Sequence, residues 1–173
     1  MGQPGNTNFL SQFGYHLVIM RLPEIEYFLQ RCSIPGLNLG AANRSTPFAS
    51  PVPYPGDLLF NDLSFSFKVD ENMDDYFSIF DWMIRLGFPE NFAQYKELAT
   101  RNRFPGNFEE GEVTSDISLL LLDNKQNPKF KFNFMSCWPT SMSDLIFNST
   151  DTTVNYITAE VVFKYTLFTF ERL

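Results

Sequence analysis

Hydrophobic and polar positions alternate most regularly in the segment that runs from Gly56 to Gly87. One set of alternate positions is apolar and the other is polar: Leu63, Phe65, Phe67 and Val69 against Ser64, Ser66 and Lys68. A period of two over this length predicts a β-strand with one buried face. After Asp70 the period changes, so we expect the strand to lead directly into a helix.

A short aromatic helix is predicted over residues 73–86. Asn72 is a good N-cap residue, the acidic side chains that follow it suit the positive end of a helix dipole, and Gly87 is a natural stop. Apolar side chains recur at i, i+3 and i+7, and neighbours widen this stripe: Phe77, Phe80 and Ile84, with Tyr76, Trp82 and Met83 beside them. We expect the first three to be the buried face of the helix.

The last third of the chain has the clearest β pattern. Residues 116–122 form a nearly continuous apolar run, which is typical of a strand covered on both faces. A polar turn leads to residues 129–137, where phenylalanine alternates with lysine and asparagine, so the two segments predict a hairpin that ends at Trp138-Pro139-Thr140. Residues 152–170 predict one unusually long final strand.

Other segments divide into strands and irregular stretches. Residues 15–21 and 26–33 predict a second hairpin near the N-terminus. Residues 1–12 predict an extended N-terminal arm, while 34–56 and 88–114 are long stretches without a regular period. Both could be surface loops. Because long structureless segments of compact domains are usually functional, we favour interaction loops that are ordered on another subunit.

The composition favours one domain of mainly β structure. A chain of 173 residues can bury a sizeable core, and its 20 phenylalanines suit pleated sheets, on which flat rings pack well. The expected fold class is therefore mainly β (α+β), an antiparallel β-sandwich or barrel with one short flanking α-helix. The net charge of −7 argues against gripping nucleic acid by phosphate neutralisation, although such a chain could surround DNA without sticking to it.

The sequence offers little catalytic chemistry. It has no glycine-rich phosphate loop, Ser/His/Asp set or HExxH motif, and Asp62 and Asp81 are carboxylates without an identifiable partner. Cys32, Cys137 and the single His16 are not spaced as metal ligands, so we expect buried or edge residues there. We therefore predict no enzyme, no cofactor and no metal, and neither a signal peptide nor a membrane span is visible. Excess sheet with free edges is instead typical of a chain that assembles with copies of itself.

Three local sequences occur in the same order as these elements. Cys32-Ser33-Ile34-Pro35-Gly36 ends the first hairpin, the span from Gly56-Asp57 to Phe80-Asp81-Trp82 carries the strand and helix, and Trp138-Pro139-Thr140 precedes the closing strand. Together they resemble the tail tube proteins of T4-like contractile-tailed bacteriophages, whose fold is shared by tube-initiator and terminator proteins.

The resemblance implies a structural virion protein. Its subunits would form homohexameric rings that stack into the inner tail tube, the conduit for DNA ejection, with a tail sheath outside. A tape-measure protein and DNA would occupy the lumen without sequence-specific binding, and the tail would be assembled in the host cytoplasm. Under this interpretation the irregular segments carry ring-to-ring contacts, and the helix covers the open end of the sandwich.

Candidate assembly residues follow from their pattern. Apolar residues of the irregular segments are the subunit-interface candidates: Phe9, Leu10, Leu37, Leu39, Phe48, Tyr54, Phe92, Phe104 and Phe108. Polar positions of two predicted strands are the lumen candidates: Ser64, Ser66, Lys68, Glu160 and Lys164. Inward-facing acidic charge would repel DNA phosphates and let the duplex slide, but the lysines leave the sign of the lumen open.

Three alternatives remain open at this point. A terminator or baseplate tube-initiator ring would have the same fold but would not polymerise. A soluble β-barrel binding module would hold an apolar ligand among its phenylalanines. A carboxylate enzyme would depend on Asp62 or Asp81.

Overall fold

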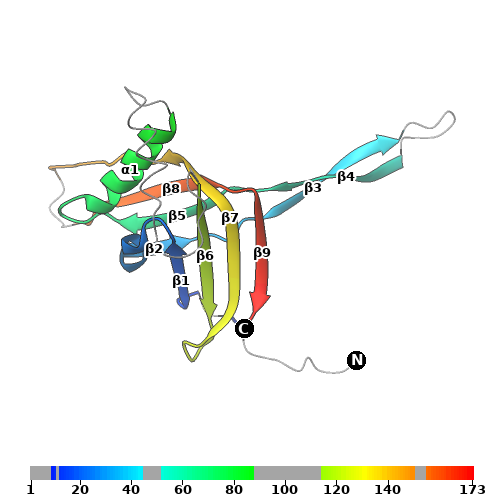
Figure 1. Ribbon diagram of the computed structural model, residues 1–173, viewed down its shortest axis with the longest axis horizontal. Helices are drawn as coiled ribbons and strands as arrows, with labels where there is room; N and C mark the ends of the chain where they lie inside the picture. Colours follow the sequence, from blue (N-terminus) through cyan, green and yellow to red (C-terminus); the bar gives the residue numbers. More distant parts are fainter. Residues whose placement is uncertain (1–8, 11, 45–51, 88–113, 151–154) are drawn as a thin grey trace.

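Strand β7, Pro128–Met142, belongs to two sheets that pack around one hydrophobic core (Figure 1). The computed structural model describes residues 9–10, 12–44, 52–87, 114–150 and 155–173. The first half of β7 pairs with β6, Ser115–Leu122, and with β9, Leu167–Arg172. On the other side of β6 lies β1, Tyr15–Ile19, so the first sheet has the order β1-β6-β7-β9.

The second sheet begins where β7 bends. The second half of β7 pairs with β8, Thr158–Lys164, which pairs with β5, Leu63–Lys68, and then β2, Leu29–Cys32. Ser136 has a φ of 53° at the bend, and its N–H donates to Asp116 Oδ1 at 2.9 Å. A left-handed residue and a register shift are typical of a β-bulge, which explains why one strand can serve both sheets.

Alternate residues of both sheets make the core, as the period-two pattern requires. The fully buried members from the first sheet are Leu17, Ile19, Ile117, Leu119, Phe134 and Cys137, and those from the second are Leu63, Phe65, Phe67, Ala159, Val161 and Phe163. The predicted strand with Leu63, Phe65 and Phe67 inside is therefore confirmed. The mainly β fold, with one α-helix in the part of the chain that the structure describes, is also as expected.

The single α-helix among the described residues, α1, spans Asp74–Gly87 and begins one residue later than predicted. Its buried residues are Asp75, Ile79 and Trp82, whereas Phe77, Phe80 and Ile84 are exposed. The predicted buried face is therefore wrong. The i, i+3, i+7 rule finds an apolar stripe, but this helix has two, and the tryptophan stripe is the one that faces the sandwich.

The predicted N-terminal hairpin is also wrong. A 3-10 helix, η1, Pro23–Phe28, separates β1 from β2. The two strands pair with β6 and β5 respectively, in different sheets. The 3-10 helix turns the chain from one sheet into the other, and Ile25 fills the space between them.

Two predictions for the C-terminal region need correction. Trp138-Pro139-Thr140 does not end β7, because Pro139 lies beside a register shift on an edge of the second sheet, where a missing N–H is tolerated. The long strand over 152–170 is divided at Tyr165 and Thr166, where the chain leaves β8 in the second sheet and enters β9 in the first. The hairpin of β6 with β7 is confirmed, but β6 is buried on one face and only half-buried on the other.

Residues 34–56 form more regular structure than expected. β3, Leu37–Arg44, and β4, Val52–Phe60, make a separate two-stranded sheet that extends away from the sandwich (Figure 1). The prolines are tolerated because both strands are edge strands. The segment is thus a projecting hairpin, and its role in subunit contact stays a prediction.

Candidate assembly surfaces

The β3–β4 hairpin is a candidate assembly surface because it has no core of its own. Every described residue of β3 is exposed, including the interface candidates Leu37 and Leu39. Tyr54 on β4 is exposed as well. Isolated two-stranded hairpins are only marginally stable in water, so apolar side chains on such an element are expected to contact something else.

The hairpin changes register halfway along its length. Leu39 pairs with Leu58, and after a shift Ala41 pairs with Pro55, so that Gly40 lies opposite both Gly56 and Asp57. A Cβ at Gly56 would lie 3.1 Å from the carbonyl carbon and oxygen of Gly40. The two backbones can therefore approach this closely because Gly56 carries no side chain, whereas a Cβ at Gly40 would meet nothing nearer than 3.4 Å.

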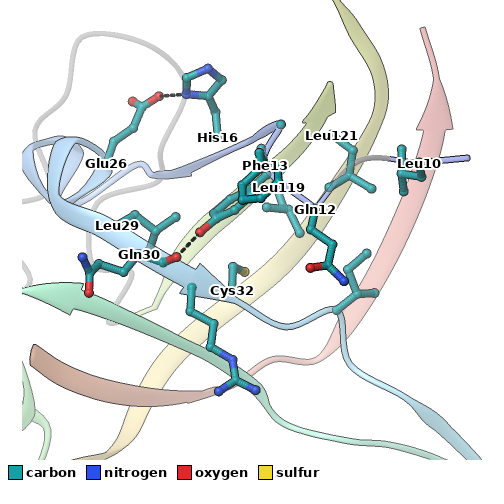
Figure 2. Close-up of a pocket in the computed structure, with 14 residues that line it drawn as sticks. Leu10, Gln12, Phe13, His16, Glu26, Leu29, Gln30, Cys32, Leu119 and Leu121 are labelled. Carbon is teal, nitrogen blue, oxygen red and sulfur yellow. Dashed lines mark hydrogen bonds and ion pairs between the residues drawn. The ribbon is translucent and has the colours of Figure 1, made fainter. Parts of the chain in front are cut away.

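A cleft of about 920 Å³ lies between β1 and β2, the edge strands of the two sheets (Figure 2). Leu119 and Leu121 of β6 and Leu29 and Cys32 of β2 line it, together with residues just before β1 that include Leu10. The Tyr15 hydroxyl donates to the Gln30 carbonyl across the cleft, joining the two edges at one point.

Ionisable groups at the cleft have simple structural explanations. At the rim, the exposed His16 places its Nδ1 3.4 Å from Oε1 of the half-buried Glu26 (Figure 2). Burial raises the pKa of the Cys32 thiol to about 12, and that of Cys137 to about 12 as well. Both cysteines are free and stay protonated at neutral pH, so they act as small apolar side chains, as expected.

The inner face of the first sheet becomes progressively uncovered toward β9. In one row of paired residues, Leu17 and Leu119 are buried, Phe132 is half-buried, and Phe170 is 70% exposed. The Phe132 and Phe170 rings are 6.2 Å apart. An apolar row that ends in an exposed phenylalanine indicates a face that the subunit alone does not complete.

The five lumen candidates lie together on the outer face of the second sheet. Register pairs Ser64 with Val162 and Ser66 with Glu160, and the neighbouring edge strand adds Arg31 opposite Ser66. Lys164 Nζ is 3.1 Å from Asp62 Oδ1. This face therefore carries lysine and arginine as well as carboxylates, and the acidic character of the whole chain is not concentrated there.

The remaining candidates divide between exposed positions and undescribed ones. Phe9 is 90% exposed, Leu10 is exposed, and the Phe9 carbonyl accepts from Asn124 Nδ2 at 3.4 Å. Phe48, Phe92, Phe104 and Phe108 lie outside the described residues.

The carboxylates that could have served an enzyme are both paired. Asp62 faces Lys164, and Asp81 Oδ2 lies 2.7 Å from Arg85 Nη2 one turn along α1. Within the described ranges, no three His, Cys, Asp or Glu side chains gather as a metal site. None of the helices in that part of the chain is long and apolar enough to cross a membrane.

Sequence reasoning missed two features of these surfaces. Phe170 was predicted only as part of a long strand, and its exposure depends on where the strand breaks. Asp75 is 4% exposed. Its pKa is raised mainly by burial and further by the negative charges of the nearby Glu24, Asp70 and Asp74. A sequence signal did exist for Asp75, since it lies at i, i+4 and i+7 with Ile79 and Trp82.

Comparison with known proteins gives a match over nearly the whole chain. A family model described as "Phage tail tube protein" matches residues 2–171. No curated protein sequence matches the chain.

Solved structures share the fold at low sequence identity. A chain of the anti-feeding prophage (AFP) baseplate has a TM-score of 0.62 at 9% identity, covering 99% of this chain and 97% of that one. A chain of the anti-feeding prophage tube terminating cap has a TM-score of 0.61 at 13% identity, with coverage of 99% and 97%. The PVC sheath-tube complex of an extracellular contractile injection system gives 0.55 at 11% identity, with coverage of 96% and 94%.

Proposed function

The chain belongs to the phage tail tube protein family, and we propose that it forms homohexameric rings that stack into the inner tube of a contractile tail. The observation that carries this proposal is the family match over residues 2–171. It agrees with the fold, which is shared with tube and terminator components of contractile injection systems. The protein is thus a structural component of a phage tail.

Ring closure would use the uncovered parts of the sandwich. β1 and β9 are the two edges of the first sheet, and β2 is an edge of the second. Open edges accept strands of another copy, and a head-to-tail contact between different surfaces generates a ring when the rotation closes. The exposed Phe170 at one edge and the cleft beside β1 and β2 at the other are different surfaces of this kind.

Stacking would use the projecting hairpin and the N-terminal arm. Strands of eight and nine residues span about 25–30 Å at 3.3 Å per residue, which is long enough to reach beyond the subunit that carries them. Leu37, Leu39 and Tyr54 on the hairpin would bury their apolar surface on the adjacent ring. Phe9 and Leu10 would add contacts from residues 1–12.

The outer face of the second sheet would line the lumen. Ser64, Ser66, Lys68, Glu160 and Lys164 present hydroxyl groups and charges of both signs there. Such a lining would let a tape-measure protein and then DNA pass without sequence-specific binding. A tail sheath would surround the tube, and assembly would take place in the host cytoplasm.

We infer that the chain is not an enzyme, because its family consists of structural tube proteins. The pairing of Asp62 with Lys164 and of Asp81 with Arg85 supports this inference. Each carboxylate has a structural partner that accounts for its position without a catalytic role.

Electron microscopy and mass measurement of the purified protein test the proposal. We expect rings with a central hole, stacked into tubes, and a ring mass six times that of the 20.0 kDa chain. Single rings that never stack would instead assign the chain to a terminator or initiator ring. A monomer that remains stable at high concentration would overturn the proposal, and binding of an apolar probe by that monomer would favour a ligand-binding module.

A further inference from the structure

The base of the β3–β4 hairpin is fixed to the sandwich by a small set of contacts. Asn61 follows β4 directly, and its N–H donates to the Gly36 carbonyl at 3.1 Å, closing the hairpin at its base. Asn38 Nδ2 on β3 donates to Asn61 Oδ1 at 2.8 Å. The Tyr165 hydroxyl, from the sandwich, donates to the Asn61 carbonyl at 2.8 Å. Asn61 therefore connects both hairpin strands to Tyr165.

Aromatic rings reinforce the same junction. The Phe60 ring, at the end of β4, lies 6.3 Å from the Tyr165 ring and 5.6 Å from the Phe168 ring, both nearly edge to face. Tyr165 in turn packs against Phe134 of the core at 5.1 Å. Edge-to-face aromatic pairs have a preferred geometry, so they restrict the orientation of Phe60 as well as its position.

The junction lies where the chain changes sheets. Tyr165 and Thr166 separate β8 from β9, and Thr166 N–H donates to the Met135 carbonyl of β7 at 3.1 Å. The hairpin is therefore attached to a bend that is held by both sheets. Because contacts with both sheets restrict this bend, it can hold the projecting hairpin in one orientation, which a flexible loop could not.

We propose that Asn61 and Tyr165, with Phe60 and Phe168, form a hairpin anchor that sets the direction of the β3–β4 hairpin before any neighbour is present. The hairpin is an isolated pair of strands exposed throughout β3, so little else among the described contacts holds it at a fixed angle. Ordering it in advance lowers the conformational entropy lost when subunits stack. The anchor residues are positioning residues, and their effect on stacking rests on the proposed function.

The hydroxyl of Tyr165 gives the sharpest test. Tyr165→Phe keeps the ring and removes only the hydrogen bond to Asn61. Tyr156→Phe is the matched control, because Tyr156 is exposed and its ring contact, with Lys68 Nζ at 5.0 Å, is one that phenylalanine keeps. Asn38→Ala is a second variant at an exposed position, for use if Tyr165→Phe fails to fold.

Spin labels at Ala42 on the hairpin and Lys125 on the β6–β7 turn report the hairpin angle. To keep the label off the native cysteines, Cys32 is replaced in a Cys32→Ser background, while Cys137 is buried. Labelled chains are diluted with unlabelled ones so that each measured distance lies within one subunit. We expect a narrow distance distribution in the parent and in Tyr156→Phe, and a broader or shifted one in Tyr165→Phe and Asn38→Ala. Distributions unchanged in both anchor variants would overturn the anchor.

Assembly provides a separate readout. Tyr165→Phe should still form rings, with a melting temperature close to that of the control, but should form fewer and shorter stacks. Full-length stacks in this variant would also overturn the anchor. Failure of the parent protein to form rings would overturn the proposed function, while the spin-label distances would still decide whether the anchor exists.

Discussion

The Trp82 indole packs against Phe163, with ring centroids 5.7 Å apart, and this contact attaches α1 to the second sheet. Trp82 is 2% exposed, and the Arg21 guanidinium lies 4.9 Å from its ring centroid. Ile79, one turn earlier, is also buried. The helix therefore contributes to the core through Trp82 and Ile79 and presents a second, exposed apolar stripe.

Trp82→Ala should lower the free energy of unfolding by about 3–5 kcal/mol, because it leaves a cavity against Phe163. Phe80→Ala, two residues earlier and on the exposed side of the helix, should cost less than about 1.5 kcal/mol, since Phe80 is 46% exposed. Denaturant unfolding of the two variants measures both values. Equal losses would contradict the assignment of the buried face.

Asp75→Asn should stabilise the subunit at neutral pH. Burial, with Glu24, Asp70 and Asp74 nearby, raises the Asp75 pKa above its ordinary value of 3.8, so the native state binds this proton more tightly than the unfolded state does. Stability from this group is greatest below pH 3.8 and falls as the pH rises through the folded-state pKa. The gain from Asp75→Asn should therefore disappear on acidification.

Chemical unfolding at pH 7 and near pH 3.5 measures this effect. Glu71→Gln, an exposed carboxylate just before the helix that is not among the groups raising the Asp75 pKa, is the control for the loss of a charge near the positive end of the helix dipole. If Asp75→Asn were less stable than this control at pH 7, the carboxylate would have a favourable partner and the interpretation would be wrong.

Phe170→Ser should weaken ring formation with little effect on the subunit. Phe170 ends the uncovered row on the first sheet, so a neighbour in a ring would bury it. Phe147→Ser is a matched control, since Phe147 is similarly exposed but lies outside the sheets. Sedimentation or mass photometry compares the ring fractions, and equal fractions would argue against ring closure at β9.

Gly56→Val should disturb the β3–β4 hairpin and leave the sandwich intact. A Cβ at Gly56 meets the Gly40 backbone at 3.1 Å, and valine adds two methyl groups beyond it. Amide hydrogen exchange should accelerate at Ala41 and Ala42 but not in β5 or β8. Gly87→Val is the control, because a Cβ there meets nothing within 4 Å. Unchanged exchange in the hairpin would show that the close approach of the two backbones at Gly56 tolerates a side chain.

Deletion of residues 1–12 should weaken stacking while the subunit still folds. Phe9 and Leu10 are exposed, so their removal takes little from the core. Tube length, measured by electron microscopy, tests the effect on stacking, and the melting temperature of the subunit tests the effect on folding. Tubes of normal length would show that the N-terminal arm does not contribute to stacking.

Local patterns were most informative where one face of an element is buried in the subunit itself. The alternation of Leu63, Phe65 and Phe67 predicted β5 correctly, and the alternation of phenylalanine with lysine predicted the first half of β7. The pattern was least informative for α1, because the exposed Phe77, Phe80 and Ile84 and the buried Ile79 and Trp82 are equally apolar. Hydrophobicity marks a side chain that avoids water, but it does not say whether the core or another surface will cover it.

The sequence by itself determined a mainly β chain, its central strand-to-helix segment and the family resemblance, because each depends on neighbouring residues. Only the tertiary structure decided that β1 and β2 lie in different sheets, that the chain changes sheets at Tyr165, and that Asn61 links the hairpin to that bend. These relations join residues up to about a hundred positions apart, such as Asn61 and Tyr165. Strand pairing of this kind is set by the packing of the whole core, and the hydrophobic period of one segment does not predict that packing.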